Sequence, residues 1–401
     1  MRIRIIAALL ALLMLTPALF ACGRKATEIK DINITNPNYN NIDSDSFTMI
    51  QAASGDTVFY AWSGFYNPHI SVFDGNRKHH VMNGLKFYSE MYNGDFFVLG
   101  DSAYFSTTSF DIEEELHPNA EDDLIYDLQE YKEYNFYRYD LGSKEHAKMF
   151  SIESSYIYTW YASTDFFAFK KYLYEKEDDE AVISDLYSLT CYDLAENTEI
   201  LVCDSIVSCS VVSGKLRYLT FSEGTFNVFE YDTKTRLSEK LGDFSIDGYN
   251  YEEYTVSYHT YNYTEEKIIV SSYNDNYDTI AVYDIAEDTL CEYTLPATIV
   301  SAIAGEKYIF ADIHTEGVYY YGEDENVTSE ADEEIDGIYR IDLSDGSYEK
   351  LDIFANEDTA LFVVSDDELI IEQGKMAFIR YKTTVFSYDV KNKELKELFS
   401  K

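Results

Sequence analysis

Seven copies of one short pattern recur along this chain of 401 residues. In each copy an apolar or β-branched run ends in an aromatic or aliphatic residue followed by Asp, and a second apolar stretch begins after a short polar gap. The aspartates are Asp74, Asp140, Asp193, Asp232, Asp284, Asp342 and Asp389, spaced 66, 53, 39, 52, 58 and 47 residues apart. A repeat of this length limits the chain to architectures assembled from copies of one small unit.

The composition indicates that the repeated unit is made of strands. The chain holds 38 Tyr and 25 Phe but only 5 Pro, and aromatic residues favour strands. The spacing of the aspartates suits four-stranded units joined by loops of variable length. We therefore predict an all-β fold, a seven-bladed β-propeller of four-stranded antiparallel blades over residues 46–401. The blades are expected to begin near Ser46, Leu85, Ile152, Asp204, Glu252, Ala297 and Asn356.

The repeated Asp has a predicted structural role. It is expected to close the third strand of each blade, where its carboxylate can accept a hydrogen bond from a backbone N–H two residues on. Such a bond fixes the turn into the fourth strand. This role explains all seven copies better than catalysis does.

The first 45 residues are expected to export and anchor the domain. Arg2 and Arg4 precede an apolar core, and Leu19-Phe20-Ala21-Cys22 follows it, as in a secretory signal. This segment resembles the lipobox of bacterial lipoproteins, which implies a signal peptide over 1–21 and a lipidated Cys22. Two acyl chains give stable anchoring. Residues 22–45 are polar and are predicted to be a flexible tether, so the expected location is the outer side of a bacterial cell membrane.

The net charge narrows the range of partners. The chain has 73 acidic and 31 basic residues, for a formal charge of −42. A charge of this sign argues against unspecific binding of nucleic acid. Apart from the membrane contact through Cys22, the expected partners are cations or basic surfaces.

The blade pattern resembles the loosely conserved bacterial propellers of the TolB-like and YWTD-like kind. The likeness rests on the Asp at the strand end and on the regular spacing of the repeats. A true Tyr-Trp-Thr-Asp sequence is absent, as are the Gly-His and Trp-Asp pairs of WD40 blades. The resemblance implies a scaffold used for binding more often than for catalysis, and a fold alone does not identify the ligand.

Three acid-rich insertions provide the candidate ligand site. They span residues 111–133, 175–185 and 323–336, and together hold 24 of the 73 acids in 48 residues. All three are predicted between the second and third strands of a blade, which places them on one face of a propeller, where a rigid scaffold carries functional loops. The alternative is that they are solvated loops that keep the protein soluble. The candidate ligand-binding residues are Asp122, Asp123, Asp178, Asp179, Asp332 and Glu333. A short amphipathic helix is expected over 119–131.

A calcium site is the one metal site that the sequence offers. Asp275, Asn276 and Asp278 supply hard oxygen ligands of the kind that Ca²⁺ requires. Their spacing lacks the Gly and terminal Glu of an EF-hand. No His or Cys spacing typical of zinc occurs.

The four cysteines after Cys22 leave their pairing open. Cys191 and Cys203 are expected on the third and fourth strands of one blade, where a cross-strand disulfide is conceivable. The other two cysteines are Cys209 and Cys291. Four cysteines allow three connectivities, and all four as free thiols is the alternative.

Two functions remain in view from the sequence. The first is a membrane-anchored binding scaffold for a protein, envelope or glycan ligand that docks on the acidic loops. The second is an extracellular propeller enzyme that acts on glycans or peptides. No nucleophile elbow occurs, and in so acidic a chain a chosen carboxylate pair carries no information, so no catalytic residue is assigned.

Overall fold

The computed structural model describes residues 48–54, 57–62, 69–83, 90–99, 101–110, 131–152, 157–177, 180–247, 260–273, 276–315, 334–353, 359–377 and 380–400. All of them belong to one compact unit, Asp31–Lys401. Within these ranges every regular element is a strand, and none is a helix that could cross a membrane. The signal peptide, the tether and Cys22 lie outside the described residues.

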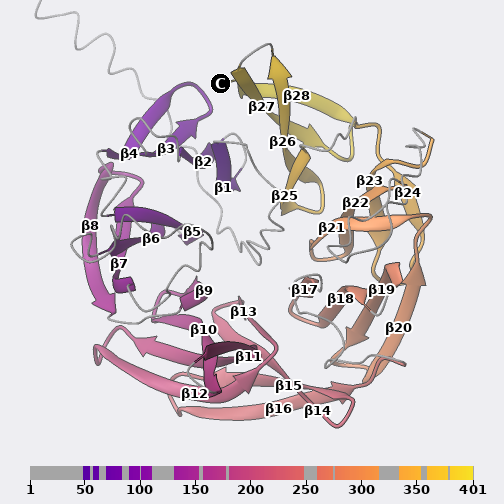
Figure 1. Cartoon of the computed structure of the whole chain (residues 1–401). Coiled ribbons are helices and arrows are strands. Elements are labelled where there is room, and N and C mark those ends of the chain that lie inside the picture. The colour runs from indigo at the N-terminus through magenta and orange to yellow at the C-terminus, as the bar shows by residue number, and fades with distance from the viewer. Residues whose placement is uncertain are drawn as a thin grey trace, which may run out of the picture. The chain divides into compact units, whose positions relative to one another are not determined.

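The strands form seven four-stranded sheets, each made of consecutive strands (Figure 1). In chain order they are β1 (Thr48–Ser54), β2 (Thr57–Trp62), β3 (His69–Asp74) and β4 (Lys78–Asn83); β5 (Glu90–Leu99), β6 (Ser102–Phe110), β7 (Tyr131–Asp140) and β8 (Glu145–Ile152); β9 (Ile157–Ala162), β10 (Phe166–Glu177), β11 (Glu180–Asp193) and β12 (Thr198–Ile206); β13 (Ser208–Val212), β14 (Lys215–Ser222), β15 (Thr225–Asp232) and β16 (Leu237–Phe244); β17 (Thr260–Tyr263), β18 (Lys267–Tyr273), β19 (Asn276–Asp284) and β20 (Thr289–Thr294); β21 (Thr298–Ala304), β22 (Tyr308–His314), β23 (Gly337–Asp342) and β24 (Tyr348–Lys350); β25 (Thr359–Ser365), β26 (Glu368–Ala377), β27 (Arg380–Asp389) and β28 (Glu394–Ser400).

The sheets are arranged as the blades of a propeller. We name them blades 1 to 7 in chain order and the four strands of each blade a to d, from the first to the last. Each strand a contacts the strand a of the next blade, and β25 of blade 7 contacts β1 of blade 1, so these contacts close a ring around the centre. The predicted all-β propeller is confirmed.

Apolar packing between neighbouring blades holds the ring together. Buried side chains form continuous clusters across blades 2 to 4, 4 and 5, 5 and 6, and 6 and 7. The high aromatic content is used here: the ring of Phe136 in blade 2 meets Trp160 of blade 3 edge to face, with centroids 5.2 Å apart, an arrangement that aromatic pairs prefer.

Blades 1 and 7 join the two ends of the ring through side chains. Because each sheet consists of consecutive strands, no described strand of one end completes the sheet of the other. Val58 and Phe73 of blade 1 pack with Ile370, Val385 and Phe399 of blade 7. The rings of Phe73 and Phe399 lie 5.0 Å apart, so burial of apolar surface, the main driving force in folding, closes the propeller.

All seven repeated aspartates end a strand c, as the sequence predicted. Their carboxylates accept hydrogen bonds from backbone N–H groups two or three residues on. Asp193 Oδ1, for example, accepts from Ala195 and Glu196 at 2.9 and 3.1 Å, and the other six aspartates make the same kind of bond. The predicted structural role of this residue is confirmed.

These bonds also determine the acidity of the turn residues. Burial raises the pKa of the Asp74 carboxyl, but hydrogen bonds from the Arg77 amide, the His79 side chain and the Asn76 amide outweigh burial and lower it to about 2. The backbone N–H of Ser143 likewise lowers the pKa of Asp140. The carboxylates of Asp74 and Asp140 are therefore held in the charged form, which is the form that accepts these bonds.

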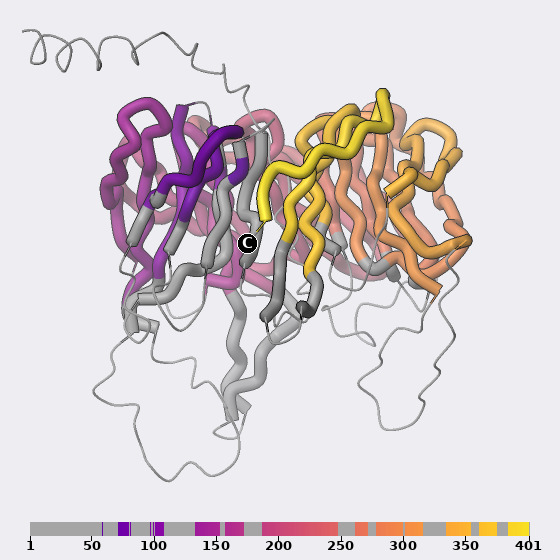
Figure 2. Tube along the Cα trace, turned by 90° about the horizontal axis from the view of Figure 1, so that it is seen from above, coloured from indigo at the N-terminus to yellow at the C-terminus, as the bar shows by residue number. Residues whose placement is uncertain are grey.

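The meander gives the propeller two unlike faces. The a–b and c–d turns lie at one end of each blade, which we name the hairpin face. The strand ends that lead from b to c and from d to the next blade lie at the other end, which we name the crossover face (Figure 2). This division of the connections is the one on which the predicted ligand site depends.

Candidate functional site

The predicted acidic site falls largely outside the described residues. The residues outside the described ranges include all six predicted ligand-binding residues, Asp122, Asp123, Asp178, Asp179, Asp332 and Glu333. The helix expected over 119–131 also lies outside these ranges, except for Tyr131. Tyr131 begins β7 and is therefore in a strand. The strand ends next to the three insertions are described. They are the b–c ends of blades 2, 3 and 6, and all belong to the crossover face.

The insertion predicted over 175–185 in blade 3 is mostly regular strand, which corrects the prediction of a loop. β10 continues to Glu177 and β11 begins at Glu180, with Glu175 paired to Val182 and Glu177 to Glu180. Aromatic and β-branched residues in Tyr172–Tyr174 and Val182–Ile183 favour strand, and this preference outweighs the acids between them. Blade 3 therefore extends at the crossover face as a two-stranded arm.

The predicted calcium ligands do not form a described site. Asp275 lies outside the described residues. Asn276 begins β19, and its backbone pairs with Tyr273. Asp278 accepts a hydrogen bond from the Thr279 hydroxyl at 3.1 Å. Within the ranges given above, no three His, Cys, Asp or Glu side chains are placed to hold a metal ion.

All four cysteines of the propeller are free thiols. Cys203 pairs across the strands with Leu189, and Cys191 pairs with Ile200, so Cys191 and Cys203 are not opposite each other. Burial raises the pKa of Cys191 to about 12. A buried thiol of this kind stays protonated and behaves as a small apolar side chain.

A set of buried polar side chains emerges when the seven b strands are aligned. The residue paired with the turn Asp gives a common origin, and the fourth residue after it forms what we name the b+4 position. Its occupants are Ala61, Ser106, Lys170, Leu219, Ser271, Asp312 and Glu372. Ser106, Lys170, Ser271, Asp312 and Glu372 are all buried. Polar side chains are seldom buried unless they are paired or functional.

The acidic members of this set lie in blades 6 and 7. In blade 6 the Asp312 carboxylate is 4% exposed, and its Oδ1 lies 3.1 Å from His314 Nε2. Burial raises the pKa of Asp312, the hydrogen bond and charge of His314 lower it, and the charge of Asp336 raises it again. Asp336 itself accepts hydrogen bonds from the amide and hydroxyl of Thr315. Acidic groups thus gather where β22 and β23 meet the crossover face.

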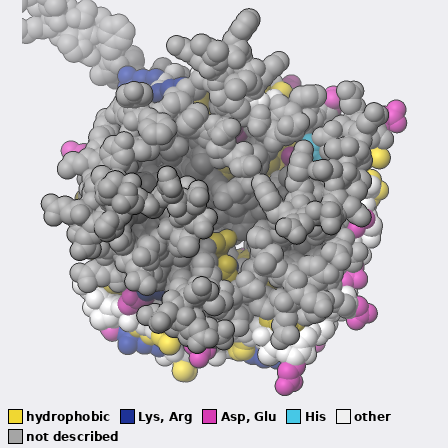
Figure 3. Space-filling view, in the orientation of Figure 1, with side chains coloured by type: hydrophobic (Ala, Val, Ile, Leu, Met, Phe, Trp, Pro, Cys, Tyr) yellow, Lys and Arg dark blue, Asp and Glu magenta, His cyan; other side chains and the backbone are white. Residues whose placement is uncertain are grey.

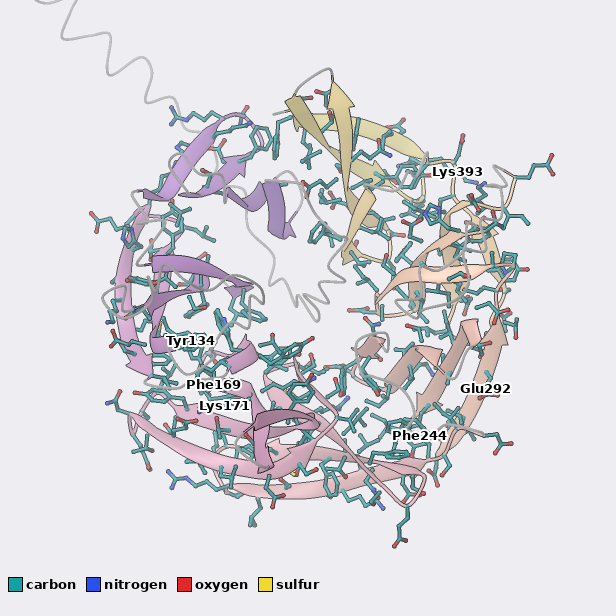
Figure 4. The ribbon with its side chains drawn as sticks, in the orientation of Figure 1. Tyr134, Phe169, Lys171, Phe244, Glu292 and Lys393 are labelled. Carbon is teal, nitrogen blue, oxygen red and sulfur yellow. The ribbon has the colours of Figure 1, made fainter. Side chains whose placement is uncertain are left out.

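The basic member, Lys170, lies in blade 3 among aromatic rings. Its Nζ is 3.8 Å from the ring centroid of Tyr187 and 4.9 Å from that of Tyr158. Burial lowers its pKa to about 8, although the nearby Cys209 side chain acts in the opposite direction. Its neighbours on β10, Phe169 and Lys171, are labelled in Figure 4. Sequence analysis missed this residue, because the b+4 position can be counted only once strands b and c are paired.

The crossover face is hollowed at its centre. In the space-filling view of Figure 3 described hydrophobic side chains are visible at the hollowed centre, and the described acidic side chains are seen mainly at the outer edge of the ring. Tyr158, on the strand a of blade 3, is 51% exposed. An open centre surrounded by loops is where propellers present a ligand site.

The hairpin face has a shallow cleft of about 600 Å³ between blades 3 and 4. Asp165, Asp193, Glu196, Lys234 and Arg236 contribute its charged lining. Arg236 is paired with Glu196 and lies 3.7 Å from Asp193. Ion pairs that are exposed to solvent have small interaction energies, and the Arg236 side chain is already engaged by acids of the protein. This cleft is therefore a weaker candidate for a ligand site than the crossover face.

Comparison with known proteins shows the fold and no family. No protein-family model and no curated protein matches the chain. Among solved structures, the chain is similar to the acylaminoacyl peptidase of Pyrococcus horikoshii, with 11% identity over 88% of this chain and 52% of that one and a TM-score of 0.52. It is also similar to the β-propeller domain of the trilobed protease of Pyrococcus furiosus (13% identity, 60% and 70% covered, TM-score 0.37) and to TolB of Acinetobacter baumannii (10%, 86% and 77%, 0.35).

The similarity to the acylaminoacyl peptidase agrees with the predicted propeller at the level of fold. The chain spans about half the length of the acylaminoacyl peptidase. At such identities the comparison concerns the backbone arrangement alone. The chain is a β-propeller that has solved structural neighbours.

Proposed function

We propose that this protein is a binding propeller, held on the outer side of a bacterial membrane by lipid on Cys22, that captures a protein or envelope ligand bearing positive charge on its crossover face. The carrying observation is topological: the strand ends next to all three acid-rich insertions belong to that one face. Binding sites are concentrated on loops that a rigid scaffold positions.

The charge of the chain supports a cationic ligand. The three insertions contain a third of all its acids, and the buried carboxyls of Asp312 and Glu372 lie in blades 6 and 7. A surface of one sign raises the local concentration and the association rate of oppositely charged partners. Calcium bound by Asp275, Asn276 and Asp278 would be an accessory to such a site.

An enzyme that acts on glycans or peptides is the second candidate that the sequence left open. The structural similarity to the acylaminoacyl peptidase favours it by analogy only, because function is not transferred with fold at 11% identity. The described residues offer Asp312 and His314 as an acid–base pair, 3.1 Å apart. Turnover of a peptide or glycan that stops in an Asp312→Asn variant would replace the binding proposal with this one.

The anchoring proposal is tested by fractionation of cells that express the full chain. Replacement Cys22→Ser removes the proposed attachment site of the lipid, so the variant is expected in the soluble fraction while the wild type stays with the membrane. Retention of the variant on membranes would contradict the anchor. Mass spectrometry of the mature N-terminus distinguishes a lipidated cysteine from an uncleaved signal segment.

The ligand proposal is tested with a fluorescent decalysine peptide as a defined cationic probe. The test variant neutralises Asp122, Asp123, Asp178, Asp179, Asp332 and Glu333 as amides. The matched control neutralises six exposed acids of the hairpin face, Asp165, Glu266, Glu287, Glu306, Asp367 and Glu394. Both variants lose the same charge, so long-range attraction falls equally in both.

The two variants are expected to differ in affinity. At 150 mM salt, where the screening length is about 8 Å, the test variant should bind the probe at least tenfold more weakly than the control. Equal affinities would show that the binding follows net charge and that the crossover face is not a site.

A further inference from the structure

The environment of Lys170 is produced by an irregularity in strand pairing. Between β10 and β9, Lys170 pairs with Thr159 and the next residue, Lys171, pairs with Ile157, so Tyr158 is the extra residue of a β-bulge. A bulge turns the extra side chain away from the regular alternation of the strand. Here it places the ring of Tyr158 beside Lys170 and against Tyr187, with ring centroids 5.0 Å apart.

Lys170 has no counterion among the described residues. Its surroundings come from three elements: Tyr158 on β9, Tyr187 on β11 and Cys209 on β13 of blade 4. Burial raises the pKa of Cys209 to about 12, so this thiol is neutral. The next residue, Lys171, provides a contrast, because its amine is paired with the carboxylate of Glu199.

A purely structural explanation does not fit this position. In blade 4 the b+4 position is filled by Leu219, which is completely buried, so an apolar residue suits the scaffold there. Burying a cation without a counterion is unfavourable, and the two tyrosine rings compensate only in part. A group that is maintained against its folding cost is a candidate functional group.

We propose that Lys170 is a covalent attachment site for a ligand that carries an aldehyde or ketone and reaches the Lys170 amine past the exposed ring of Tyr158. This function goes beyond the non-covalent capture proposed above. Of the two tyrosines that contact Lys170, Tyr158 is half exposed to solvent, whereas Tyr187 is only 6% exposed.

The reaction needs no other reagent. The lone pair of neutral Nζ attacks the carbonyl carbon, and the carbonyl oxygen takes up a proton to give a carbinolamine. Loss of that oxygen as water, with a proton from nitrogen, leaves a C=N double bond. Amine and carbonyl thus become imine and water, with no oxidant or reductant.

The protonation state makes this reaction feasible near neutral pH. With its pKa lowered to about 8, the amine is neutral in about 10% of molecules at pH 7, against about 0.03% for an amine at the ordinary value of 10.5, a difference of ~300-fold. Desolvation of a lysine in an apolar environment is a general way to make its amine nucleophilic.

The test treats the full chain with acetaldehyde and sodium cyanoborohydride between pH 6 and 9, which converts an imine into a stable ethylated lysine. Peptide mass spectrometry then follows each lysine separately. At pH 7 Lys170 is expected to react at least tenfold faster than the free compound Nα-acetyl-lysine amide, and its rate should level off above pH 8. The wild-type chain is sufficient for this measurement, so the result does not depend on a variant that folds.

Two variants locate the effect. Lys171→Arg should leave the fast component unchanged, and Lys170→Arg should remove it. Tyr158→Ala should speed the reaction at Lys170 if this ring covers the entrance. The proposal is overturned if Lys170 stays unmodified in the folded chain, or if its rate follows pH as the free compound does.

Discussion

The end of strand c and the b+4 position differ in how they are used around the ring. The first holds Asp in every blade, and each of these carboxylates accepts backbone hydrogen bonds in a turn. The second holds Ala, Ser, Lys, Leu, Ser, Asp and Glu in blades 1 to 7. A position that holds the same residue in every blade contributes to folding, which all blades share. A buried polar position that differs from blade to blade instead indicates a function that is confined to individual blades.

The contrast also separates stability from function. The turn aspartates are near the surface and each accepts a backbone hydrogen bond, so they contribute to stability at little cost. Lys170 and Asp312 are buried, and burial favours the neutral form of each side chain. It lowers the pKa of Lys170 and raises the pKa of Asp312. Such groups reduce stability, and proteins keep them where a site requires them.

The largest effect is expected from placing a charge at the b+4 position of blade 4. Leu219→Lys introduces an amine into the cluster that contains Phe226 and Val228, without the aromatic cage found in blade 3. We expect a loss of ~3 kcal/mol or more in the free energy of unfolding, measured by urea titration. Leu219→Met, as the control for side-chain shape, should cost less than ~1.5 kcal/mol. A well-tolerated lysine would mean that the position is permissive and that Lys170 needs no explanation.

Removal of the existing charge should have the opposite sign. Lys170→Met is expected to raise the free energy of unfolding by about 2 kcal/mol at pH 7, because a shift of one pKa unit corresponds to ~1.4 kcal/mol and the loss of cation–π contacts offsets part of the gain. A base whose folded pKa is lowered gains stability as pH rises from about 8 toward its unfolded value, so the variant's advantage should shrink there. Lys171→Met, which breaks the pair with Glu199, should not stabilise.

A turn aspartate should show a moderate effect. Asp284→Ala removes the acceptor of the Ala286 and Glu287 amides and the partner of Lys267, at an expected cost of ~1.5 kcal/mol. The Lys267 hydrogen bond and those amides lower the pKa of Asp284. The stabilisation is therefore present above the unfolded value of ~3.9 and is lost as pH falls through the folded pKa. Asp284→Asn, which keeps one acceptor oxygen, should cost less.

The smallest effect is expected at the end of a c–d turn. Lys393, labelled in Figure 4, has a φ of 56°, a left-handed conformation that is unfavourable for residues with a Cβ. Lys393→Gly should increase the free energy of unfolding by up to ~1 kcal/mol. The measurement is the midpoint of thermal unfolding, which should rise. Lys391→Gly, two residues earlier in the same turn, is the control and should not stabilise.

The sequence predicted the scaffold well because its determinants are local. The turn aspartates and the all-β class follow from residues close together in the chain, and in the structure each of these aspartates ends a strand c. Lys170 was missed because its site depends on a bulge in β9 and on a thiol in the next blade. The arm of blade 3 was wrongly predicted as a loop because its acids were given more weight than its alternating aromatic residues.

The central claim is that the propeller keeps an amine buried in blade 3 without a counterion among the described residues. The most direct test is an NMR titration of the chain labelled with ¹³C at the lysine Cε, with Lys170→Met to assign the resonance. The account predicts that the Lys170 signal titrates near pH 8. A Lys170 signal that stays in its charged form up to pH 10 would contradict it and would mean that the amine has a counterion or free access to water.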